Sequence, residues 1–224
     1  MKAIAIDQYG SVEELQERQV PKPVVKCNEV LIRIQATSVN PVDWKIRKGE
    51  LQEKLQFSFP IILGLDVAGA GGVGSFAIQI AKSFGAFVAT TASSKNEEFL
   101  KSLGADLIID YKKDKFEELL SDYDIVLDTI GGEVQEKSFQ IIKSGGVLVS
   151  IVHEPRHEVK GIKSGFLWLK PSGKQLDELS VLIEHRKIKP IISKVVPFNE
   201  KGVREAHILS ESQHTRGKIV ITME

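Results

Sequence analysis

A GxGxxG pattern spans Gly69–Gly74 and has the spacing of a loop that holds phosphate groups. Such a loop turns sharply, brings its backbone against a pyrophosphate and opens a helix whose unpaired N–H groups attract an anion. The pattern alone is weak, because many glycine-rich turns have no function. Here the apolar residues Ile61–Leu63, Leu65 and Val67 precede it, an apolar pattern of helical spacing follows over 76–84, and a strand is expected over 87–91. This order of strand, turn, helix and strand predicts a dinucleotide site.

The residues after that second strand indicate which dinucleotide fits. Proteins that prefer NAD place an Asp or Glu about twenty residues past the glycines, where it binds the ribose 2′-hydroxyl and repels a 2′-phosphate. This chain has Ser93, Ser94 and Lys95 instead. Two hydroxyl groups and an ammonium suit a phosphate dianion, so the sequence predicts NADP over NAD. Either serine also serves as the N-cap of a helix over 96–103, and Tyr111 either adds a hydroxyl group or is an ordinary surface tyrosine.

Composition excludes several classes of partner. The chain has 224 residues, and 30 Lys and Arg balance 30 Asp and Glu, so no basic field points to nucleic acid or to an anionic membrane. Its apolar runs are too short for a transmembrane helix, and Met1–Asp7 alternates like a strand instead of forming a signal peptide. The single cysteine, Cys27, forms no internal disulfide. These features predict a cytoplasmic protein.

The two halves of the chain differ in pattern. Up to about Gly69, strand signals over 2–6, 15–20 and 29–36 are separated by proline-containing links, as in a small barrel. From Gly71 onward helices and strands alternate, which builds a parallel sheet with a ligand at the carboxyl ends of its strands. The expected helices cover residues 96–103, 115–120, 133–142, 175–185 and 200–210, and the expected strands cover 87–91, 106–110, 124–128, 147–152, 191–196 and 218–222.

Several further motifs occur together along almost the whole chain. They are Gly69–Gly74 with Gln79 and Lys82, Met1–Ile4 with Tyr9 and Gly10, Asn28–Ile32, Ser38–Lys45, Asp128–Gly132, Gly145 with Gly146, and His214–Val220. This combination resembles the zinc-independent quinone oxidoreductases of the medium-chain dehydrogenase/reductase superfamily. The resemblance implies an α/β fold in which a Rossmann doubly wound parallel sheet (70–189) is joined to an incomplete GroES-like β-barrel domain (1–69). The last strand of 190–224 returns to that barrel.

The resemblance also implies a role for individual residues. Asn40 corresponds to the polar residue beside the nicotinamide and the substrate, with Asp43 and Lys45 in the same turn as further catalytic candidates. Asp43 and Lys45 have a plainer interpretation as a helix-capping carboxylate and a solvated lysine. The residues implied for the cofactor are Ala70, Gly71, Gly72 and Val73 at the pyrophosphate, Ser93, Ser94, Lys95 and Tyr111 at the 2′-phosphate, Gly131 and Gly132 beneath the adenosine side, and Ser150 and Val152 near the nicotinamide.

The same resemblance implies that no metal is bound. Relatives with catalytic zinc carry a cysteine in place of Asn40 and a His-Glu pair in place of Leu65-Asp66. Leucine cannot ligate zinc, and one cysteine cannot supply the four thiolates of a structural zinc site. The implied chemistry is hydride transfer from NADPH to a quinone, an enone or a similar conjugated carbonyl, whose developing oxyanion needs only a hydrogen-bond donor or water. Enoyl thioesters and aldehydes stay open as substrates.

The sequence departs from the family in one place. The family has the rest of the barrel, a helix and the first strand of the nucleotide domain between the segment matching Ile61–Gly69 and the phosphate loop. Here Gly69 leads directly to Ala70. Three explanations for the missing block stay open. They are a truncated gene product, an engineered deletion and a sequence written without part of the chain. Ile61–Val67 either pairs inside the barrel or replaces the missing strand.

Two functions and two assembly states therefore stay open. The chain is either an NADPH-dependent reductase or a nucleotide-binding relic of the family that lacks too much of the cleft to turn over. The apolar segment Phe166–Leu169 is either the edge strand of a homodimer or a core strand under the last helices.

Overall fold

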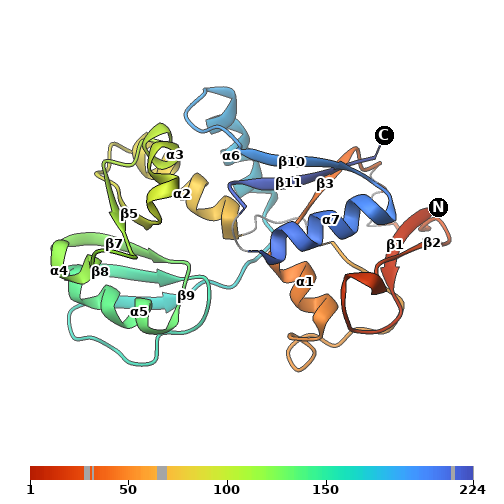
Figure 1. Cartoon of the computed structure of the whole chain (residues 1–224), viewed down its shortest axis with the longest axis horizontal. Coiled ribbons are helices and arrows are strands. Elements are labelled where there is room, and N and C mark those ends of the chain that lie inside the picture. The colour runs from red at the N-terminus through yellow and green to blue at the C-terminus, as the bar shows by residue number, and fades with distance from the viewer. Residues whose placement is uncertain (28–30, 32, 65–69, 213–214, 224) are drawn as a thin grey trace. The chain divides into compact units, whose positions relative to one another are not determined.

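The chain divides into two compact units. Unit 1 comprises Met1–Phe76 and Lys189–Glu224, and unit 2 comprises Ala77–Ile188 (Figure 1). A computed structural model describes residues 1–27, 31, 33–64, 70–212 and 215–223. Each unit has its own sheets and its own buried apolar cluster.

The first sheet of unit 1 is antiparallel and has the order β2-β1-β4. Its central strand β1 (Lys2–Ile6) pairs with β2 (Gln16–Gln19) on one side and with β4 (Ile61–Ile62) on the other. The start of Ile61–Val67 therefore pairs inside the barrel, as one of the two alternatives expected. Residues 65–69, which include most of the segment before the phosphate loop, lie outside the described residues.

The second sheet of unit 1 has the order β10-β11-β3. Its central strand β11 (Lys218–Thr222) runs parallel to β10 (Ile192–Pro197) and antiparallel to β3 (Ala36–Val39). The strand expected over 29–36 is wrong in its described part: residue 31 and residues 33–35 are irregular, and the strand begins at Ala36. Residues 29, 30 and 32 of that expected strand lie outside the described residues. The reason is pairing: β11 faces only the stretch from Ala36 to Val39, and a strand needs a partner for its backbone groups.

The two sheets of unit 1 form an open barrel. No strand pairing joins them within the part of the chain that the structure describes. Side chains from both, including Ile4, Val39 and Ile221, line a cavity of about 620 Å³. The helices of unit 1 are η1 (Val12–Glu14), α1 (Pro41–Lys48) and α7 (Glu200–Glu211), and α2 (Ala70–Ser83) begins there and continues into unit 2.

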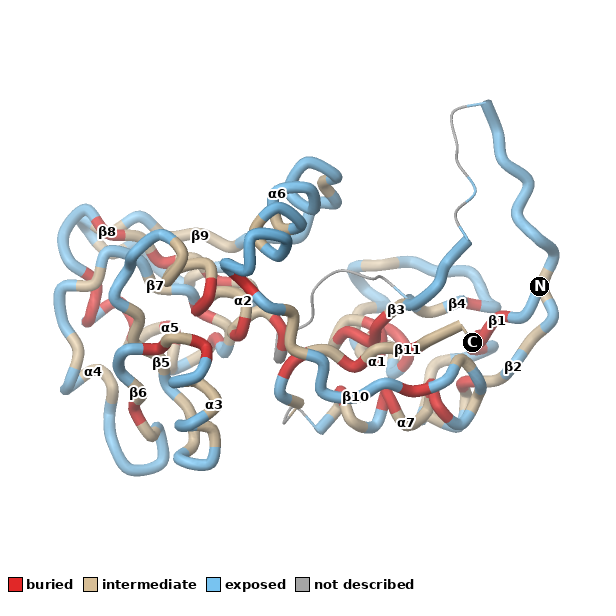
Figure 2. The backbone as a smooth tube through the Cα atoms, turned by 90° about the horizontal axis from the view of Figure 1, so that it is seen from above, coloured by how far each residue is buried: buried red, intermediate tan, exposed pale blue. Residues whose placement is uncertain are grey.

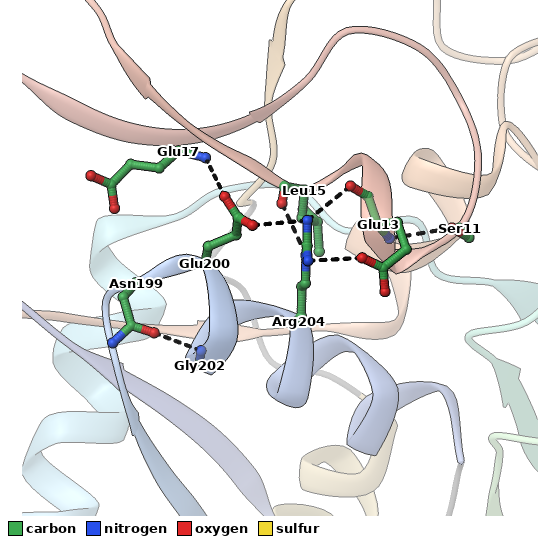
Figure 3. A network of polar contacts seen from close by, with 8 residues as sticks. All are labelled: Ser11, Glu13, Leu15, Glu17, Asn199, Glu200, Gly202 and Arg204. Carbon is green, nitrogen blue, oxygen red and sulfur yellow. Dashed lines mark hydrogen bonds and ion pairs between the residues drawn. The ribbon is translucent and has the colours of Figure 1, made fainter.

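Arg204 fastens α7 to the segment that precedes β2 (Figure 3). Its guanidinium donates hydrogen bonds to the carbonyl oxygens of Leu15 and Glu13, at 3.2 and 3.0 Å. It also forms ion pairs with the carboxylates of Glu13 and Glu200, at 2.8 and 2.9 Å. Two backbone carbonyls far away in sequence thus have a charged donor, which fixes the helix at the edge of the first sheet.

Unit 2 contains five strands in two parallel sheets. One pairs β5 (Ala89–Ala92) with β6 (Leu107–Asp110). The other has β8 (Ile142–Ser150) between β7 (Tyr123–Asp128) and β9 (Lys163–Phe166). The helices are η2 (Ser94–Asn96), α3 (Glu97–Ser102), α4 (Phe116–Leu119), α5 (Gly132–Ser138), η3 (Phe139–Ile141) and α6 (Gly173–Glu184).

The two sheets of unit 2 are the halves of one Rossmann sheet. A doubly wound sheet has the strand order 3-2-1-4-5-6. The pairs β6-β5 and β7-β8-β9 reproduce 3-2 and 4-5-6 in chain order, and among the described residues no strand occupies the position of the first strand between β5 and β7. The α/β fold with a Rossmann-type sheet and a GroES-like part is confirmed, and among the described residues the barrel is not closed and the Rossmann sheet is divided into two.

Apolar side chains that such a fold normally covers are exposed in unit 2. On β7, Ile125 and Leu127 point to the same face and are 68% and 39% exposed, because α5 packs on the opposite face (Figure 1). Helix α6 has no buried residue (Figure 2), although its leucines recur at helical spacing. No described helix is long and apolar enough to cross a membrane.

Strand β9 is the outer strand of its sheet and ends at Phe166. The following residues Leu167, Trp168 and Leu169 are more than half exposed. The segment Phe166–Leu169 is therefore not a core strand, since only its first residue belongs to a strand. A homodimer through this edge stays a prediction.

Candidate functional site

The residues expected at the 2′-phosphate lie together at the carboxyl ends of β5 and β6. Ser93, Ser94 and Lys95 follow β5 directly, and Tyr111 follows β6. The two strand ends are adjacent, because Ala92 pairs with Asp110 and the Tyr111 N–H donates to the Ala92 carbonyl at 3.3 Å. Ser94, Lys95 and Tyr111 are exposed. This edge of the sheet presents hydroxyl and ammonium donors to solvent, and such donors suit a phosphate dianion.

Asp110 lies at the same edge and was not singled out from the sequence. The pKa of its carboxyl lies below the usual value, first because the Lys112 N–H donates to it and further because Lys113 and Ser94 do so. The carboxylate thus organises the turn after β6 and holds the Ser94 hydroxyl. Ser93 occupies the N-cap position of η2, which runs directly into α3, but its side chain makes no capping hydrogen bond, and the residue before α3 itself is Asn96.

Gly131 and Gly132 lie in the turn between β7 and α5, with φ angles of +78° and +59°. Asp128, the last residue of β7, holds this turn: its Oδ1 accepts the N–H groups of Ile130 and Gly131 at 3.0 and 2.8 Å. Gly132 donates its N–H to Nε2 of His153 at 2.9 Å. The N–H groups of all three turn residues therefore have protein acceptors.

Ser150 and Val152 lie at the carboxyl end of β8, next to that turn. Ser150 is fully buried, and its hydroxyl donates to Oδ2 of Asp128 at 2.8 Å. The Val152 N–H donates to Oγ of Ser150 at 3.2 Å, while the Val152 side chain is 41% exposed. Ser150 is thus a structural link between two strand ends, and the surface that a ligand meets here is that of Val152.

Burial acts to raise the pKa of Asp128, but the hydrogen bonds outweigh it. The N–H groups of Gly131 and Ile130, the Ser150 hydroxyl and the Gln135 amide all donate to the carboxylate and leave its pKa below the usual value. An ionised carboxylate with four donors is a firm anchor for both loops. Neither Gln135 nor His153 was predicted from the sequence, and the only sequence signal was the Asp128–Gly132 motif.

Asn40 and Asp43 stand at the start of α1 in unit 1. Both side chains are about 1% exposed. Asp43 occupies the third position of the helix, where its Oδ2 accepts the Asn40 N–H at 2.7 Å in a capping box. This geometry favours the capping role that the sequence left open for Asp43. Lys45 is half-buried, with its ammonium 5.7 Å from the centre of the Trp44 ring.

Lys218 contacts two of the predicted regions within unit 1. Its Nζ donates to Oδ1 of Asn40 at 2.6 Å. Its aliphatic stem lies against Gly72 in the first turn of α2, where an added Cβ would come within 3.1 Å of Lys218 Cδ. The lysine thus places a cation between the predicted catalytic Asn40 and the predicted pyrophosphate residues. Sequence reasoning missed it because Lys218 is 178 residues from Asn40.

The glycine pattern is described only from Ala70 onward, and α2 begins there. Gly69 lies outside the described residues. The structure describes Ala70 and Gly71 as helical but does not describe their burial. A Cβ on Gly74 would meet no described atom within 4 Å. In a Rossmann fold the third glycine allows the helix to pack closely on the first strand, and the open space at Gly74 agrees with a described part of the chain that has no strand at that place. Val73 is half-buried in the same turn.

The described residues do not fit a zinc ion. No group of three or more His, Cys, Asp or Glu side chains that could hold a metal occurs among them. Cys27 is exposed, and Leu65 and Asp66, at the place of the usual His-Glu pair, lie outside the described residues.

The two-domain fold and the loops at the strand ends define the class as a dehydrogenase with a GroES-like and a Rossmann-type part. The chain matches the zinc-binding dehydrogenase family over residues 103–221 and the alcohol dehydrogenase GroES-like domain over residues 26–73. It therefore belongs to this family of oxidoreductases, among the quinone oxidoreductase-like members of the medium-chain dehydrogenase/reductase superfamily.

Individual relatives agree with this membership. The chain is 30% identical to a 2-methylene-furan-3-one reductase of Solanum lycopersicum, with 99% of this chain and 79% of the relative covered. It is 29% identical to an NADPH-dependent alkenal/one oxidoreductase of the Arabidopsis thaliana chloroplast, with the same coverage. Among solved structures, the quinone oxidoreductase of Coxiella burnetii superimposes with a TM-score of 0.82 at 25% identity, with 100% of this chain and 99% of that chain covered.

The alignments also measure the missing block. The alignment to the tomato reductase spans 317 residues, whereas this chain has only 224. Roughly 90 or more residues of the relative are therefore aligned with no residue of this chain. The alignment to a chloroplast envelope quinone oxidoreductase homologue of Arabidopsis thaliana spans 324 residues and covers 98% of that protein. The chain is thus shorter than a relative that it matches over nearly its whole length.

Proposed function

We propose that this protein is an NADPH-dependent oxidoreductase that transfers hydride to a quinone, an enone or a similar conjugated carbonyl without zinc. The observation that carries the proposal is the similarity over 79% of a reductase whose name specifies an enone substrate. Unit 1 would be the catalytic part and unit 2 the dinucleotide-binding part. The domain limits 1–69 with 190–224 and 70–189, and the cytoplasmic location, stay predictions.

NADP is the proposed cofactor because of the donors at the ends of β5 and β6. Ser93, Ser94, Lys95 and Tyr111 would hold the 2′-phosphate, and no acidic residue stands among the three that follow β5. Gly131, Gly132 and Val152 would form a wall of the site. When bound, the cofactor supplies the hydride for the reduction.

In the catalytic part, Asn40 is the group that would orient the substrate carbonyl. Lys218 donates a hydrogen bond to Oδ1 of the Asn40 amide, so this part-buried contact sets the orientation of the Asn40 side chain. A carbonyl that accepts hydride develops negative charge on oxygen, and a hydrogen-bond donor or a nearby cation stabilises it. Asn40 and Lys218 supply groups of these two kinds, which is why this chemistry needs no metal ion.

A second candidate function rests on the split sheet and the open barrel. Because β5 and β7 each lack a neighbour on one side in the described chain, a relic that binds nucleotide but does not turn over fits these observations too. Titration of the purified chain with NADPH, before and after addition of an enone or a quinone, separates the two. Acceptor-dependent loss of NADPH absorbance identifies the reductase, and binding without oxidation identifies the relic.

Lys95→Glu tests the choice of cofactor. The substitution replaces a cation by an anion at the proposed 2′-phosphate site, so we expect the dissociation constant for NADPH to rise about 10- to 100-fold, while that for NADH stays within about twofold. Lys101→Glu, on the exposed face of α3, changes the net charge equally and serves as the matched control. If both variants bind NADPH alike, or if the wild type does not prefer NADPH over NADH, the assignment of NADP is wrong.

A further inference from the structure

The imidazole of His153 connects the two loops that end β7 and β8. Its Nε2 lies 2.9 Å from the Gly132 nitrogen, and its Nδ1 lies 3.1 Å from the Glu154 carbonyl oxygen. The backbone N–H can only donate and the carbonyl oxygen can only accept. These two partners require an unprotonated Nε2 and a protonated Nδ1. The contacts are thus satisfied only by the neutral imidazole with its proton on Nδ1.

The ring also occupies the space above Gly131. A Cβ on Gly131 would lie 2.6 Å from His153 Nε2 and 3.1 Å from Val152 Cγ1. Gly131 has a φ of +78°, which side-chain-bearing residues rarely adopt. Position 131 therefore requires a glycine for two reasons: its backbone conformation, and the imidazole that leaves no space for a Cβ.

The hydrogen bond to Gly132 gives an acceptor to the first N–H of α5. Gly132 is the first residue of α5, and an N–H in that position has no acceptor within the helix. Asp128 takes the two preceding N–H groups, and His153 takes this one. Gly131 is buried and Ile130 is 66% exposed, so a ligand at this turn meets the Ile130 side chain, and the N–H groups of Ile130, Gly131 and Gly132 are already engaged.

We propose that His153 is a positioning residue of the cofactor site, which in its neutral form with the proton on Nδ1 accepts the Gly132 N–H and fixes the turn 128–132 against the end of β8. This inference rests on the proposed function, because it takes the adenosine side of NADPH to be the ligand of the turn. His153 itself does not touch the reacting atoms. It acts through Gly131 and Gly132.

The tautomer is measured first, on the wild-type protein, by nitrogen NMR of the imidazole. We expect the chemical shift of an unprotonated Nε2 and of a protonated Nδ1, and slow hydrogen exchange of the Gly132 amide. A proton on Nε2 would overturn the proposal, because Nε2 could then not accept the Gly132 N–H. This measurement needs no cofactor and no activity.

Three variants then test the consequence for binding. In His153→Ala, Gly132 loses its acceptor, and we expect its amide to exchange at least about tenfold faster and the dissociation constant for NADPH to rise about tenfold. In His153→Gln the side-chain oxygen can accept the same N–H, so binding should return to within about threefold of the wild type. His157→Ala removes an exposed imidazole from the same segment, which pairs with Glu136 instead, and should leave both quantities unchanged.

Unchanged binding in His153→Ala, or equal losses in all three variants, would overturn the positioning role. If the wild type binds no NADPH, the proposed function fails, and the tautomer and the exchange of Gly132 still decide whether His153 holds the turn. The two failures are therefore distinguishable.

Discussion

Insertion of the block that the relatives carry, between Gly69 and Ala70, is expected to raise the midpoint of thermal unfolding by about 10–20 °C. The inserted first strand would pair with β5 and with β7, and so join the two sheets of unit 2 into one. It would also help to cover Ile125 and Leu127, which are now 68% and 39% exposed. Burial of a few such side chains, at about 1.5–3 kcal/mol each, stabilises the fold by about 5 kcal/mol or more.

The measurement is a thermal melt of both proteins, together with hydrogen exchange of the β5 and β7 amides. In the longer protein these amides should exchange more slowly, because both strands then have neighbours on either side. An insertion of the same length made of glycine and serine is the control and should not raise the midpoint. Equal melting of the three proteins, or unchanged exchange at β5 and β7, would show that the block does not supply the first strand.

Acidification from pH 6.5 to pH 5 is expected to lower the free energy of unfolding by about 2 kcal/mol through His207 alone. His207 lies on α7, is 2% exposed and has no hydrogen-bond partner at Nδ1 in the described structure. Burial, and then the positive charge of the buried Arg47, lower its pKa to about 3 from 6.5.

The direction follows from proton counts. Below pH 6.5 the unfolded chain protonates His207, whereas the folded protein does not until the pH approaches 3. The unfolded state therefore binds more protons throughout this window, and stability falls as the pH falls. Carboxylates with lowered pKa values, such as Asp128, contribute a loss of the same sign only at lower pH, so the interval between pH 6.5 and pH 5 isolates the histidine.

Denaturant unfolding at several pH values checks this expectation. His207→Leu should remove the loss of about 2 kcal/mol between pH 6.5 and pH 5, because leucine takes up no proton. His185→Leu, at an exposed position at the end of α6, should retain it. If His207→Leu shows the same decline as the wild type, the buried histidine is not the source of acid sensitivity.

Most elements could be predicted from the sequence because their signals are local. The alternation of β11 and the helical spacing of α7 each extend over a few consecutive residues, and both elements form within a residue of the expected limits. The strand expected over 29–36 was displaced because its apolar alternation did not show which part would find a partner. Pairing with β11 starts only at Ala36.

The candidate site was predictable only in outline. Ser93, Lys95 and Tyr111 follow strand ends, and the carboxyl ends of parallel strands meet at one edge of a sheet, so their proximity follows from topology. His153, Gln135 and Lys218 contact the predicted residues from other segments of the chain, and no local spacing indicates such contacts.

Motifs and periodicity in the sequence already indicate the family and the α/β class, and the junction at Gly69 shows that a block of the family pattern is missing, since all of these are properties of neighbouring residues. Only the tertiary structure decided that the remaining strands form two separate sheets, that Asp43 caps a helix and that His153 holds the Gly132 N–H. Each of these depends on which donor meets which acceptor after folding. That choice is made by the packing of segments distant in sequence, and the sequence pattern does not contain it.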